Sequence, residues 1–209
     1  MHLLLLTACW LLLACVCNTE PLLTASTEVP TKGEVLVAPS VVKAILAQED
    51  NNEVLLLDEC VRELGLKKNE YHELFRSVRV KKMPDGKALL FVRPALEPYC
   101  GVFYGVHLFR YWLVTVQKEA GKQIVNVLFA NGGDGFEIFP EETMGYNDIA
   151  STGCTARGCA TVQWKFDGEK YLAFKYIQKE FSRDVDDIST RELPCLRKVP
   201  AMGKISGPQ

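Results

Sequence analysis

The hydrophobic residues of the chain follow three different patterns. Residues 1–17 form an almost uninterrupted apolar run. Residues 39–65 repeat apolar positions at three- and four-residue spacing, which is the period of an α-helix. Residues 77–181 alternate apolar and polar positions in short runs between turn residues, as β-strands do. This order predicts an α+β fold, in which N-terminal helices are followed by a mainly antiparallel β-sheet.

Capping signals and apolar spacing place the helices. Pro39 and Ser40 are typical of a helix start, and Gly65 is typical of a helix end. The spacing predicts a first apolar face from Val41, Val42, Ile45 and Leu46, and a second from Leu56, Cys60 and Leu64. A third short helix is expected in the sequence NEYHELFRSV.

Three turn sequences predict hairpins in the second half of the chain. They are PDGK at residues 84–87, EAGK at 119–122 and DGEK at 167–170. The strands between them are expected to form one sheet, so residues 39–181 are interpreted as a single α+β domain. Residues 18–38 have little periodicity and are expected to be a linker, and the polar residues 182–209 are expected to be a mobile tail.

The apolar run at the N-terminus predicts export. Its length fits a signal peptide over residues 1–17 better than a membrane span. Two processing routes fit the sequence. The stretch LLAC, ending at Cys15, matches a lipoprotein signal with lipidation of that cysteine, whereas cleavage near residues 14–18 would release a secreted protein. The expected location is therefore the periplasm or the outer envelope, or the medium.

Composition and charge exclude several kinds of partner. The chain has 24 basic and 26 acidic residues, giving a net charge of −2. This balance does not predict binding to nucleic acid or to an anionic membrane, so a membrane contact is expected only through a lipid anchor. The expected partner is an envelope or extracellular protein, or a small ligand.

Candidate catalytic and metal-binding residues are few. Only His72 and His107 remain after the apolar run, and no Gly-x-Ser-x-Gly motif is present. The turn sequences carry too few carboxylates for a calcium site. No cofactor, metal or catalytic residue is predicted, and the alternative to a non-enzymatic protein is a hydrolase that uses His107 with nearby carboxylates.

Cys154 and Cys159 are interpreted as a disulfide. Both the export signal and the absence of a second closely spaced cysteine pair argue against zinc. The four residues between them can form a hairpin loop, and Gly153 and Gly158 supply backbone freedom there. We therefore expect a hairpin that is closed by a disulfide.

The sequence YCGVFYGVHLFRYW, residues 99–112, is dense in aromatic residues. Two interpretations fit it, because both faces of a strand here would be apolar: a central strand covered on both sides, or a ligand-facing surface. The candidate binding surface consists of Phe103, Tyr104, His107, Tyr111 and Trp112.

The ordered motifs DGKALLFV, YCG, GYNDI and WKFDGEKY also resemble a group of exported bacterial proteins. The sheet hairpins of that group look like degenerate FG-GAP/VCBS repeats, and the likeness covers residues 54–175. It implies a non-catalytic, periplasmic or lipid-anchored protein. The chain departs from the pattern because no second cysteine lies close after Cys100. The resemblance therefore implies a long-range disulfide from Cys100, to Cys60 or alternatively to Cys195. The resulting expectation is an exported binding module.

Overall fold

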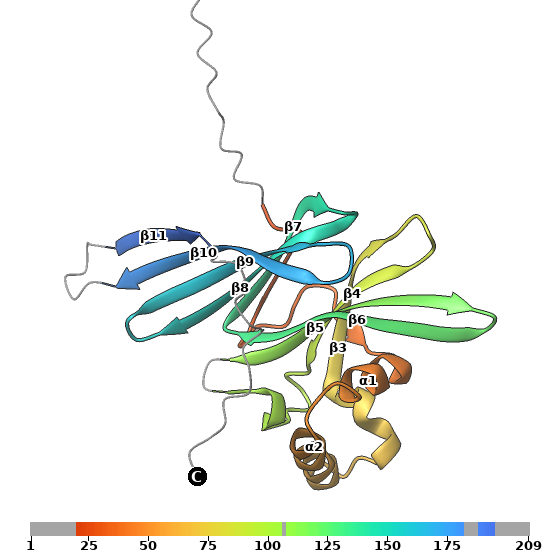
Figure 1. Ribbon diagram of the computed structural model, residues 1–209. Coiled ribbons are helices and arrows are strands. Elements are labelled where there is room, and N and C mark those ends of the chain that lie inside the picture. The colour runs from red at the N-terminus through yellow and green to blue at the C-terminus, as the bar shows by residue number, and fades with distance from the viewer. Residues whose placement is uncertain (1–19, 106–107, 182–187, 195–209) are drawn as a thin grey trace, which may run out of the picture.

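The computed structural model describes residues 20–105, 108–181 and 188–194, and it contains two antiparallel β-sheets and a helical layer (Figure 1). The six-stranded sheet has the order β1-β7-β8-β9-β10-β11. Its strands are β1 (Leu23–Ser26), β7 (Gly135–Thr143), β8 (Tyr146–Thr155), β9 (Gly158–Phe166), β10 (Tyr171–Phe181) and β11 (Ile188–Pro194).

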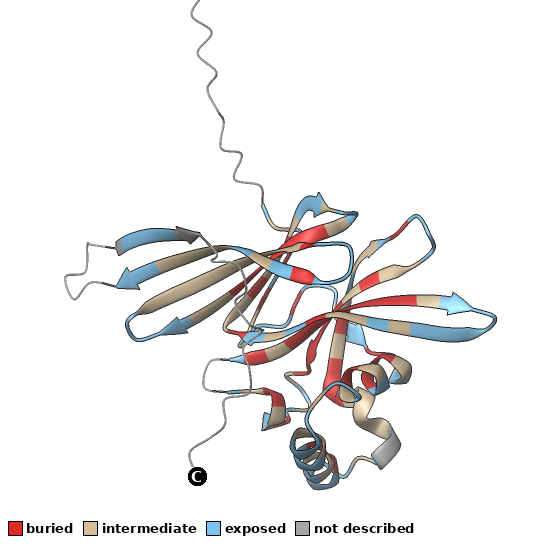
Figure 2. Cartoon of the chain, viewed as in Figure 1, coloured by how far each residue is buried: buried red, intermediate tan, exposed pale blue. Residues whose placement is uncertain are grey.

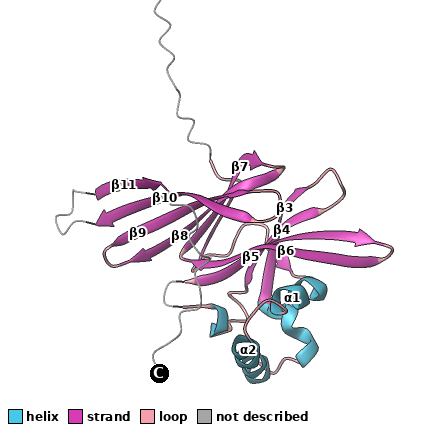
Figure 3. Ribbon diagram, viewed as in Figure 1, coloured by secondary structure: helices cyan, strands magenta, loops and turns pink. Residues whose placement is uncertain are grey.

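The five-stranded sheet has the order β2-β3-β4-β5-β6 (Figure 3). Its strands are β2 (Val35–Leu36), β3 (Phe75–Lys82), β4 (Ala88–Pro94), β5 (Phe109–Glu119) and β6 (Lys122–Gly133). The helices are α1 (Pro39–Leu46) and α2 (Asn51–Glu63), with short 3₁₀ helices η1 (Lys68–Leu74) and η2 (Gly101–Phe103). None of the helices in the described part of the chain is long and apolar enough to cross a bilayer.

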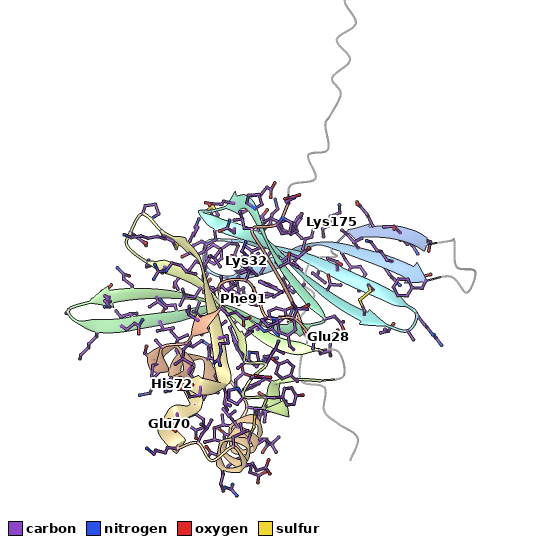
Figure 4. All side chains as sticks on the ribbon, turned by 180° about the vertical axis from the view of Figure 1, so that it is seen from behind. Glu28, Lys32, Glu70, His72, Phe91 and Lys175 are labelled. Carbon is purple, nitrogen blue, oxygen red and sulfur yellow. A yellow bond between two sulfur atoms is a disulfide. The ribbon has the colours of Figure 1, made fainter. Side chains whose placement is uncertain are left out.

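The five-stranded sheet is the middle layer, and both of its faces are buried at the centre (Figure 2). Successive residues of β5 point to opposite faces. Trp112 and Val114 therefore pack against the helices, whereas Tyr111 and Leu113 pack against the six-stranded sheet. Phe91 lies between the two sheets (Figure 4), where its ring stacks on Phe136 with centroids 5.1 Å apart. The apolar cluster that contains Trp112 and Val114 is called the helix-side core. The cluster that contains Tyr111 and Leu113 is called the inter-sheet core.

The predicted fold class is confirmed in its coarser part, antiparallel strands combined with helices, but the strands form two sheets where one is expected. The helices do not come first, because β1 and β2 precede α1. Residues 18–38 also differ from the expected linker. Leu23 and Ala25 in β1 and Val37 after β2 are buried, so the described part of this segment, from residue 20, belongs to the folded domain.

A buried arginine holds the segment between β1 and β2 in place. The guanidinium of Arg93 donates to the carbonyl oxygen of Val29 at 2.9 Å, and its Nε lies 3.8 Å from a carboxylate oxygen of Glu34. It also lies over the Phe109 ring, 4.6 Å from the centroid. A buried charge needs such partners. Arg93 thus binds a segment whose own sequence shows little periodicity.

The expected C-terminal tail also contributes a strand. Residues Ile188–Pro194 form β11, which pairs with β10, and Lys175 forms an ion pair with Glu192 at 2.8 Å. Residues 182–187 and 195–209 lie outside the described residues, as does the signal peptide predicted at 1–17.

Candidate functional site

A groove of about 780 Å³ lies at the end of the six-stranded sheet, beside the turn between β8 and β9. At this end the sheet extends past the five-stranded sheet (Figure 1). The groove is lined by residues of β8, β9, β10 and the turn: Gly153, Thr155, Ala156, Arg157, Gly158, Cys159, Ala160, Tyr176, Gln178, Lys179, Glu180 and Phe181.

The floor of the groove is hollow because its side chains are small. Strand register places Gly153 opposite Ala160. By alternation these positions lie on the same face as Ile149 and Trp164, which take part in the inter-sheet core. The face is therefore filled by large side chains near the centre of the molecule and by a glycine and an alanine at the groove.

Larger polar side chains come from β10 and from the turn. Gln178 pairs with Ala160, so its side chain shares the face of the floor, as do Tyr176 and Glu180 two residues to either side. The Gln178 amide donates to Glu180 Oε1 at 2.9 Å. Arg157 is exposed at the rim. The groove thus combines an apolar floor with an aromatic ring, an amide and a guanidinium.

The hairpin that carries the groove is held by several bonds. Cys154 and Cys159 form a disulfide with a Cα–Cα distance of 4.1 Å, the pairing that the sequence favours, and it crosses the β8–β9 hairpin. The backbone N–H of Cys154 donates to a carboxylate oxygen of Asp134. The N–H of Phe181 donates to the carbonyl oxygen of Arg157 at 2.9 Å, which ties the turn to β10. One disulfide and two hydrogen bonds therefore hold the rim in this conformation.

One position at the rim requires glycine. A Cβ atom on Gly158 would collide with the carbonyl oxygen of Lys179 in β10. The backbone of the turn therefore lies directly against β10. The sequence suggests glycine here for turn freedom, and the structure adds the contact with β10 as a second reason.

The predicted aromatic binding surface is corrected by the structure. Phe103, Tyr111 and Trp112 are buried, and they pack within the two cores. Tyr104 is partly buried, and its hydroxyl donates to the carbonyl oxygen of Pro94 at 3.0 Å. Both faces of β5 are covered, so the interpretation as a central strand applies to these side chains. His107 and Cys15 lie outside the described residues.

The long-range disulfide joins Cys60 to Cys100, with a Cα–Cα distance of 6.0 Å. It ties α2 to the residue that precedes η2. Cys195, the alternative partner, lies outside the described residues. Both disulfides fit a protein that folds outside the reducing cytoplasm.

A buried carboxylate, which no sequence motif marks, lies between α1 and α2. Glu49 accepts from Trp112 Nε1 at 2.8 Å and from Arg110 at 3.1 Å, and its side chain is 2% exposed. Burial and a hydrogen bond with Glu53 raise the pKa of Glu49 above its usual value of 4.5, although Arg110 and Trp112 oppose the shift. Each oxygen is already bonded to a neighbouring side chain, so Glu49 stabilises the junction of helix and sheet and leaves the groove as the better candidate site.

Metal ligands do not gather in the described part of the chain, where no group of three or more His, Cys, Asp or Glu side chains is placed to hold an ion. Comparisons with protein-family models, with curated proteins and with solved structures find no match. The resemblance to FG-GAP/VCBS hairpins therefore stays a prediction. The geometry of the groove is what supports a functional proposal.

Proposed function

We propose that the protein is an exported, non-catalytic binding protein and that the groove beside the β8–β9 turn binds its ligand. The observation that carries the proposal is the hollow of about 780 Å³ above small side chains, on a hairpin that a disulfide holds rigid. Ligand sites are typically concave and preformed, with an apolar lining and a few polar groups that orient the ligand. The groove has these features.

The side chains of the groove favour a planar ligand that carries a carboxylate. The floor at Gly153 and Ala160 offers no polar side chain, and the ring of Tyr176 lines the same groove. Arg157 is exposed at the rim, and a guanidinium binds a carboxylate through two parallel hydrogen bonds. One carboxylate oxygen of Glu180, Oε1, accepts from the Gln178 amide, so this acidic side chain is held beside Gln178. We infer an aromatic or otherwise flat organic acid.

Binding is favoured over catalysis because the threonine hydroxyl of the groove is already engaged by backbone groups. The Thr155 hydroxyl donates to the carbonyl oxygen of Gly158 at 3.3 Å and accepts from the N–H of Arg157 at 3.3 Å. The residues that line the groove do not include a histidine. A hydroxyl nucleophile paired with a histidine base is therefore not found among the residues that line the groove.

A titration with benzoate, followed by ¹H–¹⁵N NMR, tests the groove. Amide shifts are expected at Arg157, Ala160 and Gln178. Ala160→Leu fills the floor and is expected to abolish them, whereas Thr161→Leu adds bulk on the opposite face of the same strand and should preserve them. Shifts that survive Ala160→Leu, or an absence of shifts with the unaltered protein, would refute the proposed ligand class.

A second pair of variants tests whether the positive charge of Arg157 contributes to ligand binding. Arg157→Gln is expected to weaken benzoate binding about tenfold or more, which corresponds to the ~1.5–3 kcal/mol of a hydrogen bond to a charged group. Arg79→Gln removes an exposed cation from β3, in the other sheet, and should leave the affinity unchanged. Equal losses in the two variants would indicate a general charge effect and no specific site.

Export is supported by the two disulfides and by the apolar N-terminal sequence. Secretion and lipidation at Cys15 give different mature N-termini. Mass spectrometry of the protein from its natural source distinguishes an acylated Cys15 from an unmodified N-terminus near residue 18, and a chain that still begins at Met1 would refute export.

A further inference from the structure

The strand β6 forms an open edge of the five-stranded sheet. It is last in the strand order, and between residues 122 and 127 only β5 pairs with it in the described part of the chain. The β5–β6 hairpin projects away from the body of the molecule (Figure 3). Its tip extends past β4, because β4 pairs with β5 only up to Val116. The tip is therefore a two-stranded ribbon, which is marginally stable by itself.

The turn of this hairpin determines which backbone groups face outward. Ala120 and Gly121 both have positive φ angles, 47° and 80°, as the two central residues of a type I′ turn do. The flanking pair Glu119–Lys122 then exchanges both backbone hydrogen bonds, and bonded and non-bonded pairs alternate from there. It follows that Gln123 and Val125 direct their N–H and C=O groups to the open edge.

The open edge of β6 carries few of the features that usually prevent edge strands from pairing. Its sequence KQIVNV carries one charge, at Lys122, and no proline. The other sheet edges are β1 and β2, with four and two residues, and β11, which carries Arg191 and Glu192 and ends at Pro194. Short strands, charges and proline are the common protections of an edge. The edge of β6 has an exposed isoleucine, Ile124, 39% accessible.

We propose that β6 pairs antiparallel with β6 of a second copy of the chain, about a two-fold axis at Ile124. In this register Ile124 lies opposite Ile124 of the second copy. Gln123 lies opposite Val125, so the outward backbone groups bond to each other, and Lys122 lies opposite Asn126. No two like charges are opposed. The pairing covers Ile124, supports the ribbon and joins the two five-stranded sheets into one.

A second copy fits this edge better than an unrelated strand because the pattern of β6 complements itself. A register centred one residue further along places Ile124 opposite the polar Asn126, and it leaves both isoleucines without an apolar partner. The half-buried Val125 and Val127 pack on the helix-side core, so both copies of α1 would lie on the same side of the joined sheet.

Sedimentation equilibrium of the mature chain over a concentration series tests the pairing. The unaltered protein is expected to form dimers. Ile124→Lys places two cations opposite each other at the axis and is expected to raise the dimer dissociation constant about tenfold or more. Gln117→Lys adds the same charge on β5, on the same face and directly across from Ile124, but away from the open edge, and it should preserve the dimer.

Two results would overturn the proposal: a monomer at all concentrations for the unaltered chain, or equal dissociation constants for that chain and Ile124→Lys. Melting temperatures measured in the monomeric range separate loss of pairing from loss of folding. Gln123→Pro provides a second variant. It removes an outward N–H without breaking a bond to β5, so it should also dissociate the dimer while the monomer stays folded.

Discussion

The two disulfides lie in regions of opposite character. Cys60–Cys100 closes a separation of 40 residues and ties α2 to η2 beside the helix-side core, where Cys100 is buried. Cys154–Cys159 closes a separation of 5 residues on an exposed hairpin beside the groove. We therefore expect the first bond to stabilise the whole domain and the second to fix the local shape of the hairpin.

The packing around the two bonds differs in the same way. At the helical end, the rings of Phe75, Phe103 and Trp112 contact one another with centroid distances of 5.5–5.8 Å. At the groove, Ala160 and Tyr176 are half-buried and face the open hollow. We expect substitutions at the helical end to affect folding, and substitutions at the groove to affect binding.

The largest expected effect comes from Trp112→Ala. The change creates a cavity in the helix-side core and removes a hydrogen-bond donor from Glu49, so it should cost about 3–5 kcal/mol in the free energy of unfolding. Tyr176→Ala, the matched change at the groove, should cost about 1 kcal/mol or less. Urea denaturation with intact disulfides measures the free energy of unfolding of both variants. Similar decreases in the two variants would contradict the expected difference between the helical end and the groove.

The two disulfides are expected to differ in the same measurement. Loop-closure entropy predicts that replacing Cys60 and Cys100 by alanine costs about 4 kcal/mol and that the same change at Cys154 and Cys159 costs about 2 kcal/mol, because the second loop is much shorter. A larger loss at the hairpin would show that the groove region stabilises the whole domain, and the proposed division between the two ends would fail.

A smaller effect is expected from pH at the helical end. The pKa of Glu49 is raised by burial, so the folded state holds this proton more tightly than the unfolded state. The free energy of unfolding should therefore fall as pH rises from the ordinary value of 4.5 through the raised pKa. Glu49→Gln should lack this component. The test is to measure the free energy of unfolding of both proteins across this pH range. If the two plots of free energy against pH are parallel, Glu49 does not cause the pH dependence.

Three hairpin turns could be predicted from the sequence because their signals are local, whereas the turn at Met144-Gly145 between β7 and β8 is not among those predicted. The hairpins at Asp85-Gly86, Ala120-Gly121 and Asp167-Gly168 all form where glycine accepts a turn conformation. Cysteine spacing likewise indicates the hairpin disulfide. The third expected helix forms as the 3₁₀ helix η1, and the residues from Phe75 onward become β3.

The strands β1 and β2 could not be predicted because their stability comes from distant residues. β1 pairs with β7, where Leu23 lies opposite Ile138, and the segment that follows is held by Arg93. The aromatic run of β5 has a strong hydrophobic signal, but the signal does not show whether both faces are covered. Both faces are buried because β5 lies in the middle of three layers. The groove depends on small residues, which leave no hydrophobic signal.

The most direct test of the proposed function measures binding and folding in one variant. Cys154→Ser with Cys159→Ser releases the rim of the groove but leaves the helix-side disulfide intact. We predict a folded protein, with the NMR spectrum of the two cores preserved, that no longer shows benzoate-induced shifts at Arg157 and Gln178. Unchanged benzoate shifts in the folded variant would contradict the claim that the disulfide shapes a binding groove.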